Sequence, residues 1–161
     1  MDLEGLRKAL VRGDFSELEP QFKGSPSPVE TWLAEGQLAD DLLDEALTCA
    51  AFNGKTRVVK KLLDAGADPS AGMGTGMSAL HWAANRGHLR SVKLLVQRFA
   101  PLERLNSYGG SVLSCTVWSY FNESRPAHLE IIRFLVEAGA DPSAVQRPTG
   151  DPAIDEILGS K

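Results

Sequence analysis

Residues 76–100 read GMSALHWAANRGHLRSVKLLVQRFA, which is the pattern of two short helices joined by a tight turn. Ser78 can cap the first helix, because its hydroxyl can accept a hydrogen bond from an unpaired N–H group of the first turn. Leu80 and the Ala83-Ala84 pair follow at helical spacing. Gly87 can take the left-handed conformation that ends a helix at low cost. We therefore predict a helix that begins after Ser78 and stops at Gly87.

A second apolar helical stripe follows the glycine, made by Leu89, Val92, Leu95 and Val96. One such helix pair cannot bury its apolar face alone, whereas stacked copies can. The chain should therefore contain further copies of the same unit.

Copies appear when the chain is shifted against itself by 33 residues. Leu47, Leu80 and Leu113 fall in register, and Gly54 aligns with Gly87. The six letters GADPSA also occur twice, at 66–71 and at 139–144. Their glycines should end the second helix of their own copies in the same way as Gly87 ends a first helix. The repeat predicts a solenoid of helix pairs.

The copy at 66–101 resembles an ankyrin repeat. Ser78-Ala79-Leu80-His81 stands where that family usually has Thr-Pro-Leu-His, and Ala83-Ala84, Gly87-His88 and Gly66-Ala67-Asp68 also match the family pattern. The resemblance implies an all-α ankyrin-repeat solenoid of L-shaped units, each with a hairpin-like finger and two antiparallel helices. It also implies that fingers and first helices form a concave surface, on which ankyrin proteins usually bind partners.

The length of 161 residues fits one domain with about three full repeats and a capping half-repeat at each end. In the N-terminal cap, Ala9, Gly13, Leu18 and Phe22 fall where a first helix, its glycine stop and a second helix would place them. The expected parts are an N-terminal cap at 1–23, an insertion with a short helix at 24–38, repeats at 39–71, 72–105 and 106–144, and a C-terminal cap at 145–161.

The first insertion lies in GSPSPVETWLAEGQLAD, residues 24–40. Pro28 can stand in the first turn of a short helix that carries Trp32 and Leu33. Two interpretations remain open at this point. Either an extended finger offers Trp32 to a partner, or Trp32 covers the edge of the first repeat.

The second insertion adds seven residues to the third repeat, within CTVWSYFNESRPAH at 115–128. Tyr120 occupies the place of the helix-ending glycine, so the first helix should continue for about two more turns. The resemblance implies that Trp118 falls at the family's variable, surface-facing position of the first helix, equivalent to Asn85. Aromatic anchors dominate many interfaces, which favours a partner contact at Trp118. Alternatively, Tyr120 and Phe121 fold back over neighbouring helix ends.

Composition narrows the function classes. The net charge of −4 argues against a general nucleic-acid footprint, which requires a strongly basic surface. We interpret the densest basic run, Lys55 to Lys61, as the solvated face of a helix. No apolar run is long enough to span a bilayer, and MDLEGLRKAL lacks the features of a secretory signal. Two cysteines do not suggest a disulfide framework. We therefore expect a cytoplasmic protein without nucleic-acid or membrane partners.

Residues with potential chemistry have structural explanations in the repeat register. His81 belongs to the family's capping turn, while His88 and His128 open second helices. Cys49 and Cys115 occupy equivalent packing positions, and no histidine is placed to serve either as a base. The glycines of AGMGTGMS fall in a finger rather than in a phosphate loop. We expect no catalytic residue, metal or cofactor.

The sequence thus predicts a non-enzymatic protein that binds another protein on its concave face. The narrower hypothesis is a dedicated inhibitor or immunity protein that blocks an enzyme or toxin. The alternatives are a scaffold or self-associating protein and, least favoured, an enzyme built on the repeat, and we expect a monomer. The expected partner-binding residues are Trp32, Met77, Asn85, Arg86, Ser107, Tyr108, Trp118 and Tyr120.

Overall fold

In this computed structural model, the regular secondary structure of the described residues consists of α-helices and short 3-10 helices. The structure describes residues 1–72 and 74–159; residue 73 of the expected second repeat and residues 160–161 of the expected C-terminal cap lie outside the described part. The elements are α1 (Leu3–Arg12), η1 (Glu19–Phe22), α2 (Pro28–Ala34), α3 (Asp40–Phe52), α4 (Thr56–Asp64), α5 (Ala79–Asn85), α6 (Leu89–Gln97), α7 (Val112–Asn122), α8 (His128–Glu137), η2 (Pro142–Ala144) and α9 (Pro152–Gly159).

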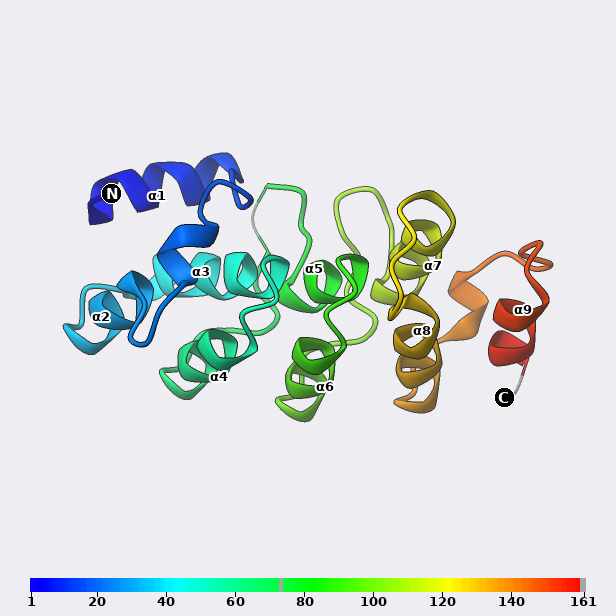
Figure 1. Cartoon of the computed structure of the whole chain (residues 1–161). Helices are drawn as coiled ribbons and strands as arrows, with labels where there is room; N and C mark the ends of the chain where they lie inside the picture. The colour runs from blue at the N-terminus through cyan, green and yellow to red at the C-terminus, as the bar shows by residue number, and fades with distance from the viewer. Residues whose placement is uncertain (73, 160–161) are drawn as a thin grey trace.

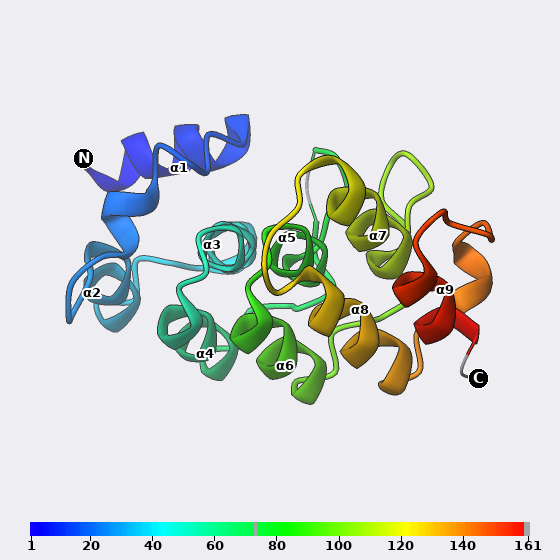
Figure 2. The same cartoon turned by 45° about the vertical axis from the view of Figure 1, so that its right-hand side comes forward.

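The helices form an elongated stack with the two termini at opposite ends (Figure 1). Helices α3, α5 and α7 pack side by side in one row, and α4, α6 and α8 pack in a second row beside them (Figure 2). The loop between α4 and α5, which we call the first finger, and the loop between α6 and α7, the second finger, rise above the rows. This arrangement confirms the predicted all-α solenoid.

The predicted helix ends are present. The Ser78 hydroxyl accepts a hydrogen bond from the His81 N–H at 3.4 Å. Gly87 has a φ of +77°, and the two GADPSA glycines, Gly66 and Gly139, have φ values of +97° and +110°. Each glycine stands just after the helix it was expected to end. The repeated letters therefore mark the same backbone turn in the first and third repeats.

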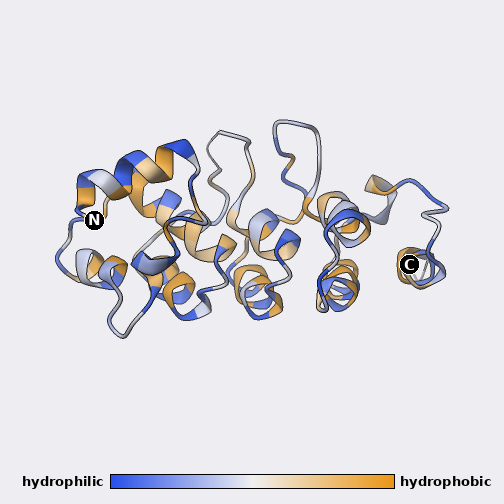
Figure 3. Ribbon diagram, turned by 45° about the horizontal axis from the view of Figure 1, so that its top comes forward, coloured by the Kyte–Doolittle hydropathy of each residue, from blue (hydrophilic) through white to orange (hydrophobic). Residues whose placement is uncertain are grey.

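The core runs continuously through the stack. The leucines that define the 33-residue register, Leu47, Leu80 and Leu113, are all buried. The alanines of α5, Ala83 and Ala84, are fully buried too, and their small side chains let neighbouring helices approach closely. In Figure 3 the helices carry apolar and polar residues on different sides. Each helix pair thus buries its apolar side against the next pair.

Histidine side chains connect successive repeats. The Nε2 atom of His88, at the start of α6, lies 2.9 Å from the Phe52 carbonyl oxygen at the end of α3. The Nε2 atom of His128 makes the equivalent contact with the Asn85 carbonyl oxygen at 2.8 Å. His81 Nε2 lies 3.1 Å from the carbonyl oxygen of Gly110 in the second finger. These rings satisfy backbone carbonyl groups across repeats, in keeping with their predicted structural roles.

The N-terminal end differs from the expected order of helices. Leu18 and Phe22 are buried, but they belong to a turn that ends in the short 3-10 helix η1 rather than to a second helix. Pro20 lacks an N–H group and stands in η1. The role of outer helix falls to α2, which packs beside α4. Ser27 and Glu30 start α2 with a capping box.

The extension of the first helix in the third repeat is shorter than predicted. Helix α7 ends at Asn122, four residues beyond the position equivalent to the end of α5. This is about one turn rather than two. The Asn122 side chain turns back to donate to the Trp118 carbonyl at 2.8 Å. The remaining inserted residues form the loop that leads to α8.

A strained residue ends α6. Phe99 stands where the other repeats have Gly66 and Gly139, and it adopts a φ of +62° with 91% of its surface exposed. A left-handed conformation costs an L-residue about 1–2 kcal/mol, and the exposed ring recovers none of it by burial.

We predict that Phe99→Gly raises the free energy of unfolding in urea by about 1 kcal/mol. Gly66→Ala is the reciprocal control and should lower it. A destabilised Phe99→Gly variant would contradict this account.

The buried histidines predict a pH dependence of stability. Burial lowers the pKa of His81, His88 and His128, although their hydrogen bonds to backbone carbonyls act in the opposite direction. The unfolded chain therefore binds protons at these rings more readily than the folded chain does. The free energy of unfolding should be highest above about pH 6.5, the ordinary histidine pKa, and should fall as the pH drops below it.

Urea unfolding at about pH 7.5, 6 and 5 measures this dependence. Replacing His88 or His128 by Gln should lower stability at neutral pH and flatten the fall on acidification. The prediction fails if stability is constant over this range, or if the histidine variants keep the full slope.

Candidate functional site

Helices α3, α5 and α7 and the two fingers form one surface, which we call the inner face. It corresponds to the concave surface that the sequence resemblance implies. The fingers are joined to each other, since the Ser107 N–H donates to the Thr75 carbonyl at 2.8 Å. The inner face therefore presents residues from two adjacent repeats as one unit.

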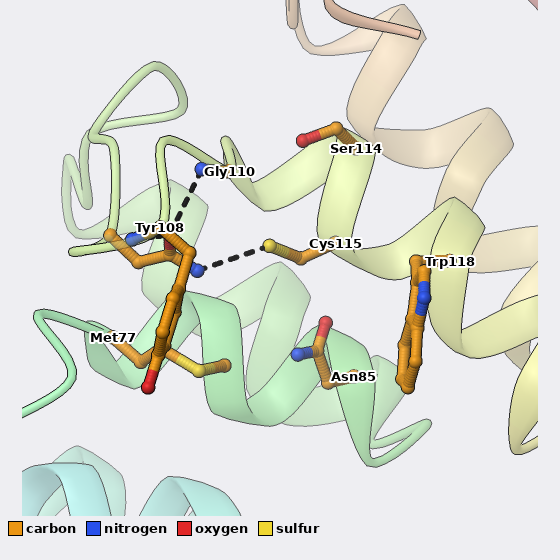
Figure 4. A pocket seen from close by; sticks show the side chains of 8 residues that line it. Met77, Asn85, Tyr108, Gly110, Ser114, Cys115 and Trp118 are labelled. Carbon is orange, nitrogen blue, oxygen red and sulfur yellow. Dashed lines mark hydrogen bonds between the residues drawn. The ribbon is translucent and has the colours of Figure 1, made fainter.

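A pocket of about 600 Å³ opens on this face between α5, the second finger and α7. It is lined by Met77, Asn85, Asn106, Tyr108, Gly110, Ser114, Cys115 and Trp118. Tyr108 and Trp118 stand on opposite sides of it, with Asn85 between them on α5 (Figure 4). Tyr108 is 82% exposed and Trp118 is 59% exposed. None of the residues that line the pocket carries a formal charge. The pocket thus offers two aromatic side chains at its rim.

Asn106 shapes the finger that carries Tyr108. Its Oδ1 accepts hydrogen bonds from the N–H groups of Tyr108 and Gly110, both at 2.9 Å. Its Nδ2 donates to the Cys115 sulfur at 3.3 Å. A Cβ at Gly110 would lie only 2.5 Å from that sulfur, so any larger residue here would force the Cys115 side chain or the finger to shift. The aromatic ring at the finger tip is therefore mounted on a fixed turn rather than on a free loop.

The pocket exists because equivalent positions differ between repeats. Trp82 stands 33 residues before Cys115 and packs edge to face on Phe15 and Phe52, with ring centroids 5.8 and 5.1 Å apart. It fills the space between the N-terminal cap and the first two repeats. The much smaller Cys115 leaves the corresponding space between the second and third repeats open.

Asn85 brings an unused hydrogen-bonding group to the pocket. Its side-chain oxygen is buried and has no hydrogen-bond partner within the described chain. A buried acceptor without a partner costs about 1–3 kcal/mol. Because this oxygen is itself buried, a bound molecule reaches it only if the Asn85 side chain rotates toward the pocket. As it stands, the pocket is suited to an apolar or aromatic group.

The structure brings together five of the eight residues expected to bind a partner. Met77, Asn85, Tyr108 and Trp118 line the pocket. Ser107 lies beside Tyr108 in the second finger.

The other three expected residues are engaged elsewhere within the chain. Arg86 places its guanidinium carbon 4.4 Å from the centroid of the Phe52 ring. The Tyr120 hydroxyl donates to Asp151 at 2.6 Å, which ties α7 to the C-terminal end. Trp32 is partly buried against the core, which corresponds to the second of its two interpretations. We leave these three residues out of the candidate surface.

Sequence reasoning missed four lining residues, namely Asn106, Gly110, Ser114 and Cys115. In the 33-residue register the large Trp82 corresponds to the much smaller Cys115. A loss of side-chain volume at a position that faces the previous repeat was the available signal.

The basic run of α4 is largely paired inside the molecule. Arg57 and Lys61 contact the buried carboxylate of Glu30 at 2.9 and 2.6 Å, and Lys55 contacts Glu19 at 3.0 Å. Burial alone would raise the pKa of Glu30, but Lys61, Ser27 and Arg57 outweigh it and lower that pKa to about 2. These cations thus hold α2 and η1 against α4, which refines the prediction of a solvated face.

Cysteine reactivity is suppressed at both positions. Burial raises the pKa of the Cys49 and Cys115 thiols, so both stay protonated near neutral pH. Among the residues that the structure describes, no group of three or more His, Cys, Asp or Glu side chains could hold a metal ion. Nor does the described part of the chain contain a helix with the length and apolar character needed to cross a membrane.

Comparison with known proteins agrees with this geometry. A family model described as ankyrin repeats in three copies matches residues 32–146. An ankyrin repeat protein of Coxiella burnetii is 30% identical over 118 residues, which cover 71% of this chain and 35% of the relative. The palmitoyltransferases ZDHHC13 of Homo sapiens and Pongo abelii are also 30% identical over 118 residues, covering 70% of this chain but 18% of each enzyme.

The match spans about a third or less of these relatives, so their other properties are not carried over. The family model covers most of the chain and coincides with its stacked helix pairs. The chain belongs to the ankyrin-repeat family, whose repeats generally mediate interactions between proteins.

Proposed function

We propose that this protein binds a partner protein through its inner face, with Met77, Asn85, Tyr108 and Trp118 as the main contacts. The observation that carries the proposal is the pair of exposed aromatic side chains on either side of an uncharged pocket. Aromatic residues placed around a pocket are typical of the few positions that dominate protein–protein affinity. The hydrogen-bonded finger turn and helix α7 fix the backbone that carries both residues before binding, which reduces the entropic cost of association.

An enzymatic function has little support at this site. Its polar side-chain groups are two asparagine amides, a serine hydroxyl, the Tyr108 hydroxyl, the Trp118 indole N–H and a protonated thiol, and they include no carboxylate or imidazole that could serve as a general base. The inhibitor or immunity role remains a narrower proposal. It predicts that the activity of an isolated partner enzyme or toxin falls in proportion to its occupancy by this protein.

Trp118→Ala and Tyr108→Ala should each weaken partner binding by about 30-fold, the value that corresponds to 2 kcal/mol at an interface hot spot. Both side chains are mostly exposed, so the free energy of unfolding should change little. Phe121→Ala is the matched control, because Phe121 is a 48% exposed aromatic residue of the same helix outside the pocket.

The measurement starts with quantitative affinity purification on four baits: the native chain and the three variants. The partner is the protein retained by the native chain and by Phe121→Ala but depleted from the two pocket variants, and its Kd is then measured by calorimetry. Equal retention on all four baits would refute this use of the inner face. A dimer of the native chain that Trp118→Ala dissociates would instead support self-association.

A further inference from the structure

The first repeat replaces a finger with an acidic helical turn. Helix α5 begins at Ala79, which corresponds to residue 46 of the first repeat in the 33-residue register. Helix α3 begins six residues before that point, at Asp40. Asp44 thereby occupies the position equivalent to the pocket residues Met77 and Gly110, and Asp41 the position equivalent to Ser107. The part of the inner face beside the pocket thus carries carboxylates where the pocket carries uncharged groups.

These carboxylates are only weakly neutralised within the chain. Asp40 and Asp41 are exposed, and the Asp41 carboxylate has one cation nearby, Arg7, at the limiting distance of 4.0 Å. Asp44 accepts the N–H of Asp68 at 2.7 Å, which brings a fourth aspartate close. Arg104 lies near enough to lower the pKa of Asp68, after the larger effect of Ser70. The acidic turn, defined as Asp40, Asp41 and Asp44, therefore keeps a net negative charge.

The same register explains why the pocket does not continue into the first repeat. Phe52 stands at the position of Asn85 and Trp118, but Trp82 and Arg86 cover its ring. Along the inner face, an uncharged aromatic pocket over the second and third repeats is thus followed by a negative surface over the first. A partner that is complementary to both must be apolar at one point and cationic at another.

We infer that the partner docks through a segment that inserts one apolar or aromatic side chain into the pocket and sets a Lys or Arg against the acidic turn. This inference rests on the proposed function. Neighbouring helices lie ~8–10 Å apart, and an extended chain advances ~3.3 Å per residue. The acidic turn lies one to two repeats from the pocket, so the basic residue should stand about three to six positions from the anchor.

A phage-displayed library of random 12-residue peptides, selected on the native chain, tests this inference. The selected peptides should share an apolar anchor with a Lys or Arg about three to six positions away. Their affinities are then compared for the native chain, Trp118→Ala and the double variant Asp41→Asn/Asp44→Asn. Asparagine at 44 retains an oxygen that can accept the Asp68 N–H.

The selected peptides should bind the double variant about ten-fold more weakly than the native chain at low salt. Their affinity for the double variant should also depend less on salt concentration. The control is Glu17→Gln/Glu130→Gln, which changes the net charge equally at two exposed carboxylates outside the pocket and the acidic turn, and it should leave affinity unchanged. Peptides that require Trp118 but contain no basic residue, or that bind the double variant as tightly as the native chain, would overturn the inference alone.

Two further outcomes point elsewhere. If no selected peptide depends on Trp118, the proposed function itself fails, because the pocket is then not a docking site. If the native chain dimerises and the dimer, rather than a peptide, requires Trp118, a second copy occupies the pocket and the inference is also overturned.

Discussion

Every helix pair in this protein depends on the pair beside it for burial of its apolar side. A pair of helices of seven to thirteen residues has too little apolar area of its own to form a core, so the leucines of the register are buried only in the stack. The histidine contacts reinforce this dependence. His88 and His128 each satisfy a carbonyl group of the preceding repeat, so a displaced repeat would lose hydrogen bonds as well as packing.

The need to bury each helix pair against the next limits side-chain size at some positions of the repeat and not at others. Positions that face the next repeat on the core side must keep their size, whereas positions at the inner face can exchange bulk for space. Trp82 and Cys115 show both outcomes at equivalent places: the tryptophan completes an aromatic cluster, and the cysteine leaves a pocket. The candidate site is therefore a local departure from the repeat pattern that the stack tolerates because its core remains filled.

The sequence was sufficient for the fold, because helix ends and register depend on local rules. A serine cap before Leu80 and a left-handed glycine at 87 act within a few residues, and both are where the pattern put them. The N-terminal end could not be derived in this way. Whether η1 or α2 becomes the outer helix depends on contacts with α4, including the distant ion pairs of Glu30, and no local pattern encodes these.

The site was predictable in part for a related reason. Trp118 falls where the ankyrin family has a variable, surface-facing position, and Tyr108 stands in a finger, so both residues could be named from the register and the family pattern. Tyr120 stands where the register expects a helix-ending glycine, but its hydroxyl donates to the Asp151 carboxylate, a contact between residues 31 positions apart. The pocket depends in the same way on how Asn106 folds the finger against Cys115. Residues that depart from the repeat pattern are therefore candidates for a binding site. Contacts between repeats decide which of these side chains are engaged within the chain and which are free to contact a partner.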